Sequence, residues 1–385
     1  MKLLFVSQVT DNRLRDVPRV LYCVGEEMRR RGHAVDYFFE EHGPKPLIRQ
    51  AALMEWPMRT APVIGRRTQK AGYDAIIATT ASGWCLSTFR RVLLPSKTRI
   101  VSWHHGFEEL MWAQMLEEEQ RGGHRYSKKF KLYYNTILWA NRKSLQTQDG
   151  AFFTSTEERD WIRARYPRQA QKALYLPNGV SPEYYFQERF EAPAAESPVR
   201  LLFVGYWDPW RKGRKYLIEA FTQLHRQYPD IRLTLAGTKL TDEQILPDFP
   251  PETHGAIEVV PHLNELESVE IYRQHDIFIL PALFEGMPLV VLEAMASAMP
   301  VVTTGNNGMK DLITHYENGM LVPRRDSKAL VQAIAHLIEN PELRRKLGEA
   351  ANDTVQTYYT WRQVTDIFEE GMFRILHNRL ENGAC

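Results

Sequence analysis

Short apolar runs alternate with longer amphipathic stretches along the first half of the chain, and the same alternation begins again after residue 200. In the first half the strand-like runs are Leu3–Val6, Ala34–Phe39, Ala75–Ala78, Arg99–Trp103 and Gly150–Phe153, with a helical pattern over Val17–Arg31. Buried strands separated by helical crossovers are typical of a parallel sheet covered by helices on both faces. The first half is therefore predicted to be one doubly wound domain.

The second half repeats this pattern. Its elements are Arg200–Val204, a helix over Lys215–Gln227, then Leu233–Ala236, Ile257–Val260, Ile277–Leu280 and Pro300–Thr303. A polar, proline-bearing stretch over 187–200 separates the two halves and has the composition of a linker. For 385 residues we predict an α/β protein of two Rossmann-like domains facing across a cleft: residues 1–190, residues 200–360, and a terminal helix over 361–385 that packs toward the first domain.

Composition removes several classes of function. A formal net charge of +2 gives the whole chain no electrostatic reason to bind nucleic acid. Three widely spaced cysteines fit neither a disulfide framework nor a metal cluster, which favours a cytoplasmic protein. The apolar run at the start is too short for a signal peptide, and the most apolar stretch, 277–302, is interrupted by glutamates and prolines. We expect a soluble or peripheral protein.

The segment 280–296 carries the most chemical information. A strand ends at Leu280, a loop carries Glu285 and Gly286, and Pro288 stands where the first turn of a helix accepts proline. The amides of Leu289 and Val290 then point out of the helix start, where the helix dipole favours anions. Glu285 and Glu293 are eight positions apart, so each can accept hydrogen bonds from a different hydroxyl group of one extended ligand. The structural alternative is a loop charge followed by a solvated helix position.

A second loop, 205–213, follows a strand and precedes a helix, and it is cationic. Arg211 can grip phosphate bidentately and Lys212 can act as a point charge, which suits a departing nucleoside diphosphate. The sequence has no Asp-x-Asp motif, so we expect no metal or other cofactor, and we expect Lys212→Ala to reduce turnover with little unfolding. An exposed basic turn is the alternative interpretation.

Together these segments resemble the retaining glycosyltransferases of family 4, which have the GT-B architecture and a paired-glutamate motif. The likeness covers nearly the whole chain and includes further matches at 105–106, 177–180, 204–205, 211–213 and 317–323. The resemblance implies that Glu285 contacts hydroxyls of the transferred sugar and that Glu293 contacts the ribose. It also implies donor contacts from backbone or side chains of Gly205, Leu263, Gly286, Met287, Leu289 and Val290.

In the first half, the resemblance assigns the approach to the sugar to His105, which precedes Gly106. His104 is the competing choice, and a purely structural histidine pair is the alternative. The chain departs from the family pattern at three places. The loop Thr10–Arg19 lacks the usual glycine pair, and its Arg13, Arg15 or Arg19 is a candidate for contacts to phosphate or acceptor. Tyr206 stands where an arginine is usual. Lys310–Asp311 replaces Pro-Glu.

The stretch 121–143 contains basic and aromatic residues and no Asp or Glu. It suits either peripheral contact with anionic lipid or a core helix with a solvated basic face. We therefore predict an enzyme that moves a hexose-type sugar from a nucleotide sugar to a glycan, lipid-linked or small-molecule acceptor, with retention and without metal. A nucleotide-sugar epimerase on the same fold and a non-catalytic nucleotide-sugar-binding subunit are the rival predictions.

Overall fold

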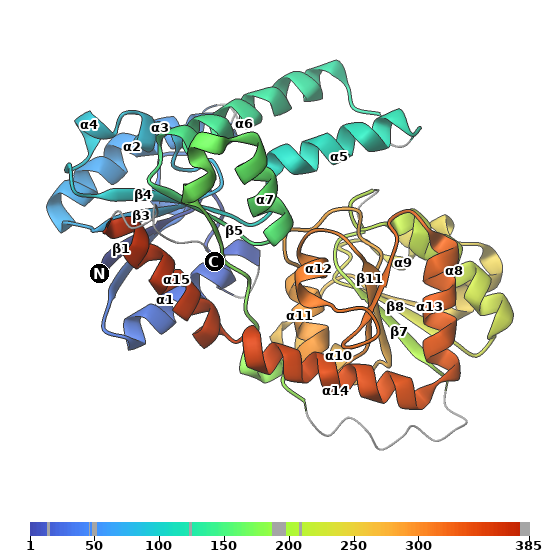
Figure 1. The fold of residues 1–385 in the computed structure, drawn as a ribbon. Helices are drawn as coiled ribbons and strands as arrows, with labels where there is room; N and C mark the ends of the chain where they lie inside the picture. Colours follow the sequence, from blue (N-terminus) through green and yellow to red (C-terminus); the bar gives the residue numbers. More distant parts are fainter. Residues whose placement is uncertain are drawn as a thin grey trace. The chain divides into compact units, whose positions relative to one another are not determined.

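The computed structural model describes residues 1–13, 16–45, 47, 52–122, 125–186, 198–207 and 210–377, and its contacts divide the chain into two compact units (Figure 1). Unit 1 comprises residues 1–178 together with the chain from Trp361 onward, and unit 2 comprises Gly179–Thr360. Arg15, Asp208, Pro209 and most of the expected linker lie outside the described residues.

Unit 1 contains a six-stranded parallel sheet in the order β2-β1-β3-β4-β5-β6. Its strands are β1 (Lys2–Val6), β2 (Ala34–Phe38), β3 (Ala75–Thr79), β4 (Arg99–His104), β5 (Gly150–Phe153) and β6 (Ala173–Tyr175). Its α-helices are α1 (Asp16–Arg30), α2 (Ala52–Ala71), α3 (Trp84–Thr88), α4 (Arg90–Leu93), α5 (Glu108–Gln120), α6 (Lys128–Thr147), α7 (Thr156–Arg165) and α15 (Trp361–Leu376). Short 3-10 turns occupy Glu40–His42 (η1) and Pro167–Lys172 (η3).

Alternating side chains of this sheet face two different helical layers, because successive residues of a strand point to opposite faces. On one face Phe5, Trp103 and Phe152 pack their rings against Phe368 of α15, with ring centroids 5.4 to 5.9 Å from that ring. On the other face Leu4, Val6, Ile76, Ala78 and Ile100 join a core cluster with residues of α2, α3 and α6. The terminal helix α15 therefore completes the core of unit 1, next to α1 (Figure 1).

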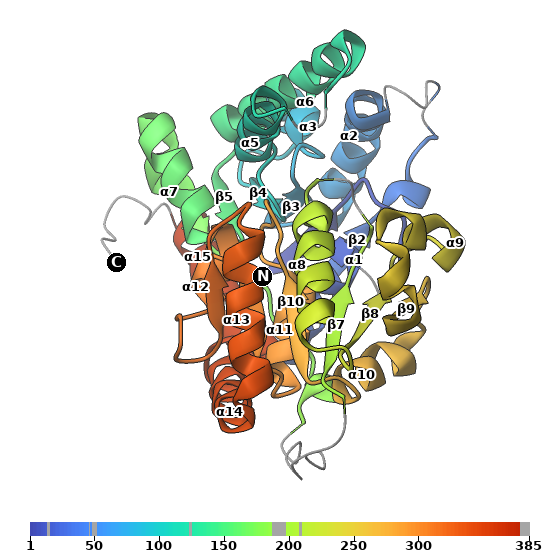
Figure 2. The same ribbon diagram turned by 90° about the vertical axis from the view of Figure 1, so that its right-hand side faces the viewer.

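Unit 2 contains a second six-stranded parallel sheet, in the order β12-β11-β10-β7-β8-β9. Its strands are β7 (Arg200–Val204), β8 (Arg232–Ala236), β9 (Ile257–Val260), β10 (Ile277–Leu280), β11 (Val301–Thr304) and β12 (Met320–Val322). Its α-helices are α8 (Arg214–Gln227), α9 (Asp242–Ile245), α10 (Glu265–Arg273), α11 (Leu289–Ala296), α12 (Asn307–Leu312), α13 (Ser327–Glu339) and α14 (Pro341–Tyr358) (Figure 2). Short 3-10 turns occupy Pro182–Tyr184 (η4), Leu246–Asp248 (η5) and Pro251–Ala256 (η6).

The fold class predicted from the apolar runs is confirmed: both halves are parallel sheets with helices between the strands. Residues 179–186, which the linker argument placed in the first domain, belong to unit 2. They are held there because the Phe186 amide donates to the Ala296 carbonyl (3.2 Å) and the Ser297 hydroxyl donates to the Tyr184 carbonyl (3.1 Å). Among the described helices, none combines the length and apolar content that a membrane crossing requires.

Candidate functional site

The loops after β7 and β10 of unit 2 are joined at the carboxyl edge of the sheet, where ligands of open parallel sheets bind. β7 and β10 are neighbours, with Leu201 opposite Ile277, so their following loops start side by side. The amide of Leu283 in the second loop donates to the Arg211 carbonyl of the first at 2.7 Å. This hydrogen bond places the predicted cationic loop against the predicted carboxylate loop.

Lys212 and Glu285 form an ion pair at this junction, with 2.7 Å between Nζ and Oε1. Their side chains are 10% and 12% exposed, so the pair is nearly buried. Burial alone would raise the pKa of Glu285, but the charges of Lys212 and Arg211 outweigh it and hold the pKa below its ordinary value. Glu285 is therefore ionised at neutral pH, and its oxygens can only accept hydrogen bonds.

Two glycines make this close approach of loops possible. Gly213 has a left-handed φ of 71° at the start of α8, and a Cβ there would lie 1.9 Å from the Pro281 carbonyl oxygen. At Gly308 a Cβ would lie 2.1 Å from the Gly286 carbonyl oxygen, to which the Gly308 amide donates at 2.8 Å. Side chains at these positions would push the carboxylate loop away from its neighbours.

The loop after β11 supports the carboxylate loop from the other side. The Asn306 side-chain amide donates to the carbonyls of Ala282 (3.1 Å) and Leu283 (3.3 Å), and the Thr304 hydroxyl also donates to the Ala282 carbonyl. Asn306 and Thr304 are each 1% exposed. The Glu285 loop is thus anchored on both sides by buried hydrogen bonds.

Helix α11 begins directly after this loop. Pro288 is the residue before the helix, with φ −73° and ψ 122°, and not part of its first turn as the sequence suggested. The difference arises because the ψ of Pro288 is extended and not helical, so the helix begins one residue later, at Leu289. Gly286 and Met287 are buried, whereas Leu289 and Val290 are only partly buried. The first amides of a helix have no acceptor within the helix, so those of Leu289 and Val290 are suited to bind an anion.

Glu293 is buried on α11, with 5% of its surface exposed, and accepts a hydrogen bond from the Tyr272 hydroxyl at 2.6 Å. The alternative that it is a solvated helix position is therefore wrong. A carboxylate buried against a tyrosine hydroxyl retains further acceptor positions on its oxygens.

Gly205, Tyr206 and Leu263 lie along the same edge of the sheet. Gly205 has φ 145°, and a Cβ there would lie 3.3 Å from Cε of Lys212. Where the family resemblance expects an arginine, the ring of Tyr206 lies under Nζ of Lys239, 4.1 Å from the ring centroid. Leu263 is partly buried in the loop after β9, two strands from β7 and so about 10 Å away along the sheet.

The histidines of unit 1 differ in position although they are adjacent. His104 is the last residue of β4, fully buried, stacked on Phe153 at 4.8 Å, and its Nε2 lies 3.0 Å from the Ser102 hydroxyl. His105 is partly exposed, and its Nε2 is buried with no hydrogen-bond partner among the described residues. Nδ1 of His104 is likewise buried without a hydrogen-bond partner among the described residues, so what distinguishes His105 is its greater exposure.

Burial lowers the pKa of both histidines to about 3, so both are neutral at physiological pH. Glu158 of α7 fixes the loop that follows them, because its Oε1 accepts the Phe107 amide at 2.8 Å. Burial raises the pKa of Glu158 to about 8. The loop that presents His105 is therefore tied to an uncharged carboxyl group.

The first loop of unit 1 is held by acidic and aromatic side chains in place of a glycine pair. The Tyr22 hydroxyl donates to Asp11 at 2.8 Å, and the Asp11 amide donates to Glu41 at 2.6 Å. The Arg13 guanidinium lies 4.2 Å from the centroid of the Tyr22 ring and 3.8 Å from Glu26. Arg19 lies on α1, the helix that follows this loop.

Lys310 and Asp311 lie on α12, the helix that follows the Asn306 loop. The Asp311 carbonyl accepts the Tyr359 hydroxyl at 2.8 Å, which fixes the backbone of α12 at this point.

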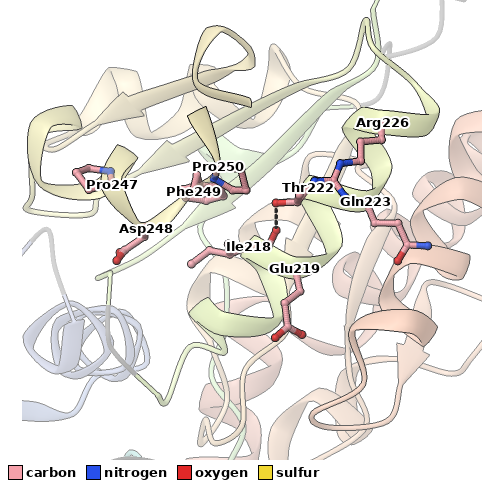
Figure 3. Close-up of a pocket in the computed structure, with 9 residues that line it drawn as sticks. All are labelled: Ile218, Glu219, Thr222, Gln223, Arg226, Pro247, Asp248, Phe249 and Pro250. Carbon is pink, nitrogen blue, oxygen red and sulfur yellow. Dashed lines mark hydrogen bonds between the residues drawn. The ribbon is translucent and has the colours of Figure 1, made fainter. Parts of the chain in front are cut away.

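A surface depression of about 680 Å³ lies elsewhere on unit 2, between α8 and η5 (Figure 3). Its lining includes Thr222, Arg226 and Asp248, and none of the predicted site residues. Within the described part of the chain, no three His, Cys, Asp or Glu side chains gather as metal ligands would.

Comparison with known proteins agrees with this two-part organisation. Residues 17–184 match the sequence model of Glycosyltransferase Family 4, and residues 185–354 match that of Glycosyl transferases group 1. Sucrose-phosphate synthase from Thermosynechococcus elongatus has the same fold, with a TM-score of 0.77 and 20% identity over 98% of this chain and 100% of that one. This chain is a glycosyltransferase of the GT-B type.

This glycosyltransferase also matches HepE from Anabaena, solved in complex with UDP-glucose, with a TM-score of 0.70 and 17% identity over 97% of this chain and 99% of that one. Among curated sequences it is 27% identical to EpsD of Bacillus subtilis, a glycosyltransferase whose name is itself provisional, over 70% of this chain and 68% of EpsD. The chain spans between 40% and 68% of the first three curated relatives it matches. Because the fold serves many donors and acceptors, these matches define the class and not the substrates.

Several residues that shape the site had not been predicted from sequence. Thr304 and Asn306 carried no signal, because their role depends on the pairing of β10 with β11. No sequence pattern indicated Tyr272 either, since only the packing of α10 brings its hydroxyl to Glu293. Glu158 had a readable signal: Ser155 precedes it by three positions, in the Ser-x-x-Glu pattern of a helix start.

Proposed function

We propose that this glycosyltransferase moves a hexose-type sugar from a nucleoside diphosphate donor to an acceptor hydroxyl, with retention of anomeric configuration and without a metal. The observation that carries the proposal is the nearly buried Lys212–Glu285 pair beside the start of α11. It combines a cation, a sugar-binding carboxylate and helix-terminal amides at the carboxyl edge of one sheet.

Each group has a separate task in this proposal. Lys212 and Arg211 offset the charge that develops on the departing diphosphate, and the amides of Leu289 and Val290 bind its oxygens. Glu285 accepts hydrogen bonds from hydroxyls of the sugar, and Glu293 accepts them from the ribose. The two cations supply the charge that a metal ion would otherwise supply.

The ion pair also explains why both charges are stable in the absence of a donor. Without donor, Lys212 neutralises Glu285, so neither charge is left unpaired in a nearly buried position. A bound diphosphate would share Lys212, while sugar hydroxyls would take up the oxygens of Glu285. We infer that retention follows from attack on the same face as the leaving phosphate, which itself accepts the proton of the acceptor hydroxyl.

The known relatives support a nucleotide-sugar donor. The Anabaena protein of the same fold was solved with UDP-glucose, and the curated relatives include a glycogen synthase. The acceptor is proposed as a glycan, a lipid-linked sugar or a small molecule.

The first experiment screens UDP-, GDP-, ADP- and dTDP-sugars by thermal shift on the full chain in EDTA. A ligand at about 100 times its dissociation constant adds about 2.7 kcal/mol to the free energy of unfolding. Release of the nucleoside diphosphate from each stabilising donor is then followed by chromatography, and proton NMR of the product gives the anomeric configuration. Donor binding without any release would instead indicate a non-catalytic binding subunit.

The decisive variant is Lys212→Met, which keeps the aliphatic bulk and removes the charge. Turnover should fall on the order of 100- to 1000-fold, as it does when one charge-stabilising donor is lost from an active site. Lys215→Met is the matched control, because that lysine is three residues away with a side chain 73% exposed. Equal turnover of the Lys212 and Lys215 variants would remove Lys212 from the mechanism.

A further inference from the structure

One helical layer of unit 1 carries a large excess of positive charge. It consists of α2, α3, α4 and α6, which contact one another and cover one face of the first sheet; we call it the basic layer (Figure 1). Its four helices contain eleven Lys and Arg residues and one acidic residue, Glu55, a surplus of ten positive charges. Arg67, Arg90, Lys131 and Arg142 pair with acids of other elements, which leaves a surplus of six positive charges on this layer of a chain whose formal net charge is only +2.

The same layer exposes large apolar side chains. Leu132 on α6 is 70% exposed and Val92 on α4 is 81% exposed. Trp139 on α6 and Phe89, between α3 and α4, are 50% and 54% exposed. The ring of Trp139 lies 5.1 Å from that of Trp84 on α3, which shows that these helices meet at this surface. Exposed apolar side chains of this size on adjoining elements are typical of an interaction surface.

The exposed residues of α6 form one stripe. Lys128 and Lys129 precede Leu132 by four and three positions, and Trp139 follows Leu132 by seven, so all lie along the same face of the helix. Lys128 and Lys129 are exposed, whereas Lys131 and Arg142 are paired with Glu119 and Glu109 of α5. The stripe therefore combines two exposed cations at one end with two exposed apolar side chains.

The two lysines occupy a position that is unfavourable for the helix itself. They are the first two residues of α6, and its first turn contains no acidic residue. The positive end of the helix dipole repels cations there, so local stability favours Asp or Glu at these positions. The dipole and the lysines instead add to the positive potential of the same end of α6, which indicates a negatively charged partner.

We propose that the basic layer docks unit 1 on an anionic lipid bilayer, with Lys128 and Lys129 at the headgroups and Leu132, Trp139, Phe89 and Val92 entering the interface. A basic face with aromatic and aliphatic side chains among the charges fits the boundary between headgroups and acyl chains. Basic residues act over about 8 Å at physiological ionic strength, so binding needs close approach to anionic lipid. Docking does not depend on the proposed transfer reaction, since an inactive chain would bind equally well.

The experiment is flotation of the full chain with vesicles of phosphatidylcholine alone and with phosphatidylglycerol at 30 mol%, in low and in 0.5 M salt. The protein should float with the anionic vesicles, remain at the bottom with the neutral ones, and lose most of its binding in high salt. No flotation with anionic vesicles would overturn the proposal, whether or not the protein transfers sugar.

Variants test whether the basic layer is the surface that binds. Lys128→Glu/Lys129→Glu should reduce partitioning by at least about 25-fold, because each of the two lysines near anionic lipid contributes roughly a factor of five and the new carboxylates are repelled. The matched control is Lys328→Glu/Lys346→Glu, which makes the same change of charge at exposed lysines of α13 and α14 in unit 2. Equal loss in both variants would show a nonspecific charge effect and would overturn the assignment.

The apolar contribution is tested with Val92→Ser/Leu132→Ser, two side chains exposed enough to be changed without harm to the core. This variant should unfold at the temperature of the wild type but retain only part of the vesicle binding, mostly the part that salt removes. If the serine variant binds vesicles as well as wild type but abolishes a dimer seen by light scattering, the surface is an interface between copies of this chain and the bilayer proposal is wrong.

Discussion

Buried carboxyl groups occur in both units of this glycosyltransferase, but their charge states are opposite. In unit 2, Glu285 is nearly buried, yet the cations Lys212 and Arg211 hold its pKa below the ordinary value. In unit 1, Glu158 is fully buried, and burial, together with the charge of the nearby Glu108, raises its pKa to about 8. The same side chain is therefore an anion in one unit and a neutral group in the other.

This difference indicates which of the two positions accommodates a charge. An ionised carboxylate kept next to a lysine can exchange partners when a ligand brings its own charge and hydroxyl groups. The protonated carboxyl group of Glu158 accepts a hydrogen bond from the Phe107 amide and so holds a loop in place. Glu285 is thus placed to meet substrate, whereas Glu158 is a positioning residue for the His105 loop.

The largest expected effect comes from breaking the pair in unit 2. Lys212→Met leaves Glu285 nearly buried and unpaired, so the free energy of unfolding should fall by about 3 to 5 kcal/mol. The sequence alone predicted little unfolding for Lys212→Ala, so the burial of the pair leads to a different prediction. Urea titration followed by tryptophan fluorescence measures the change.

The double variant Lys212→Met/Glu285→Gln sharpens this result. It removes the unpaired charge and should recover most of the lost stability, while the rate of sugar transfer should remain low. If the double variant is as unstable as the single one, the cost lies in packing against Gly205 and not in the charge.

The second prediction concerns the pH dependence of unit 1. A group whose pKa is higher in the folded state stabilises fully below its unfolded pKa, and that contribution is lost as pH rises through the folded value. For Glu158, the protection of the Phe107 region from hydrogen exchange should fall as pH rises from about 4.5 to about 8. The slope for one such group is at most about 1.4 kcal/mol per pH unit.

Glu158→Gln should abolish this slope, because the amide keeps an oxygen for Phe107 and does not titrate. Hydrogen exchange of unit 1 measured at several pH values provides the test. His104 gives the opposite sign: burial lowers its pKa to about 3, so its contribution is present above about 6.5 and lost as pH falls toward 3. An unchanged slope in Glu158→Gln would mean that Glu158 is ionised in the folded protein.

The sequence predicted the strands well because their apolar runs are short and continuous, as over Ile277–Leu280, where every residue is buried. It missed β6 and β12, which have three residues each and stand at sheet edges. Lys212 and Glu285 were both named from local patterns. Their contact could not be predicted, because it follows from the pairing of β7 with β10 across about 75 residues of chain.

The third prediction tests the hydrogen bond between Tyr272 and the buried Glu293. Tyr272→Phe removes the hydroxyl that donates to Glu293 at 2.6 Å. A hydrogen bond to a charged group contributes about 1.5 to 3 kcal/mol, so stability should fall by that amount or less. If Glu293 binds the ribose, the KM for donor should rise while kcat changes little. A fall in kcat as large as the rise in KM would place Glu293 in the chemical step.

The smallest effect is expected at Lys239, a cation held over a ring and not beside a carboxylate. The resemblance expects an arginine at position 206, where this chain has a tyrosine, and Nζ of Lys239 lies 4.1 Å from the centroid of that ring. A contact of this kind at an exposed site contributes about 0.5 to 1 kcal/mol. We predict that Lys239 supplies part of the charge that the arginine would supply, so Lys239→Ala should raise the donor KM about two- to fivefold with stability almost unchanged. Tyr206→Arg in the same background should restore the KM, since it returns the cation to the same edge of the sheet from the neighbouring strand β7. A donor KM that is unchanged in Lys239→Ala, or not restored by the second substitution, would show that only the ion-paired Lys212 and its neighbour Arg211 act on the diphosphate.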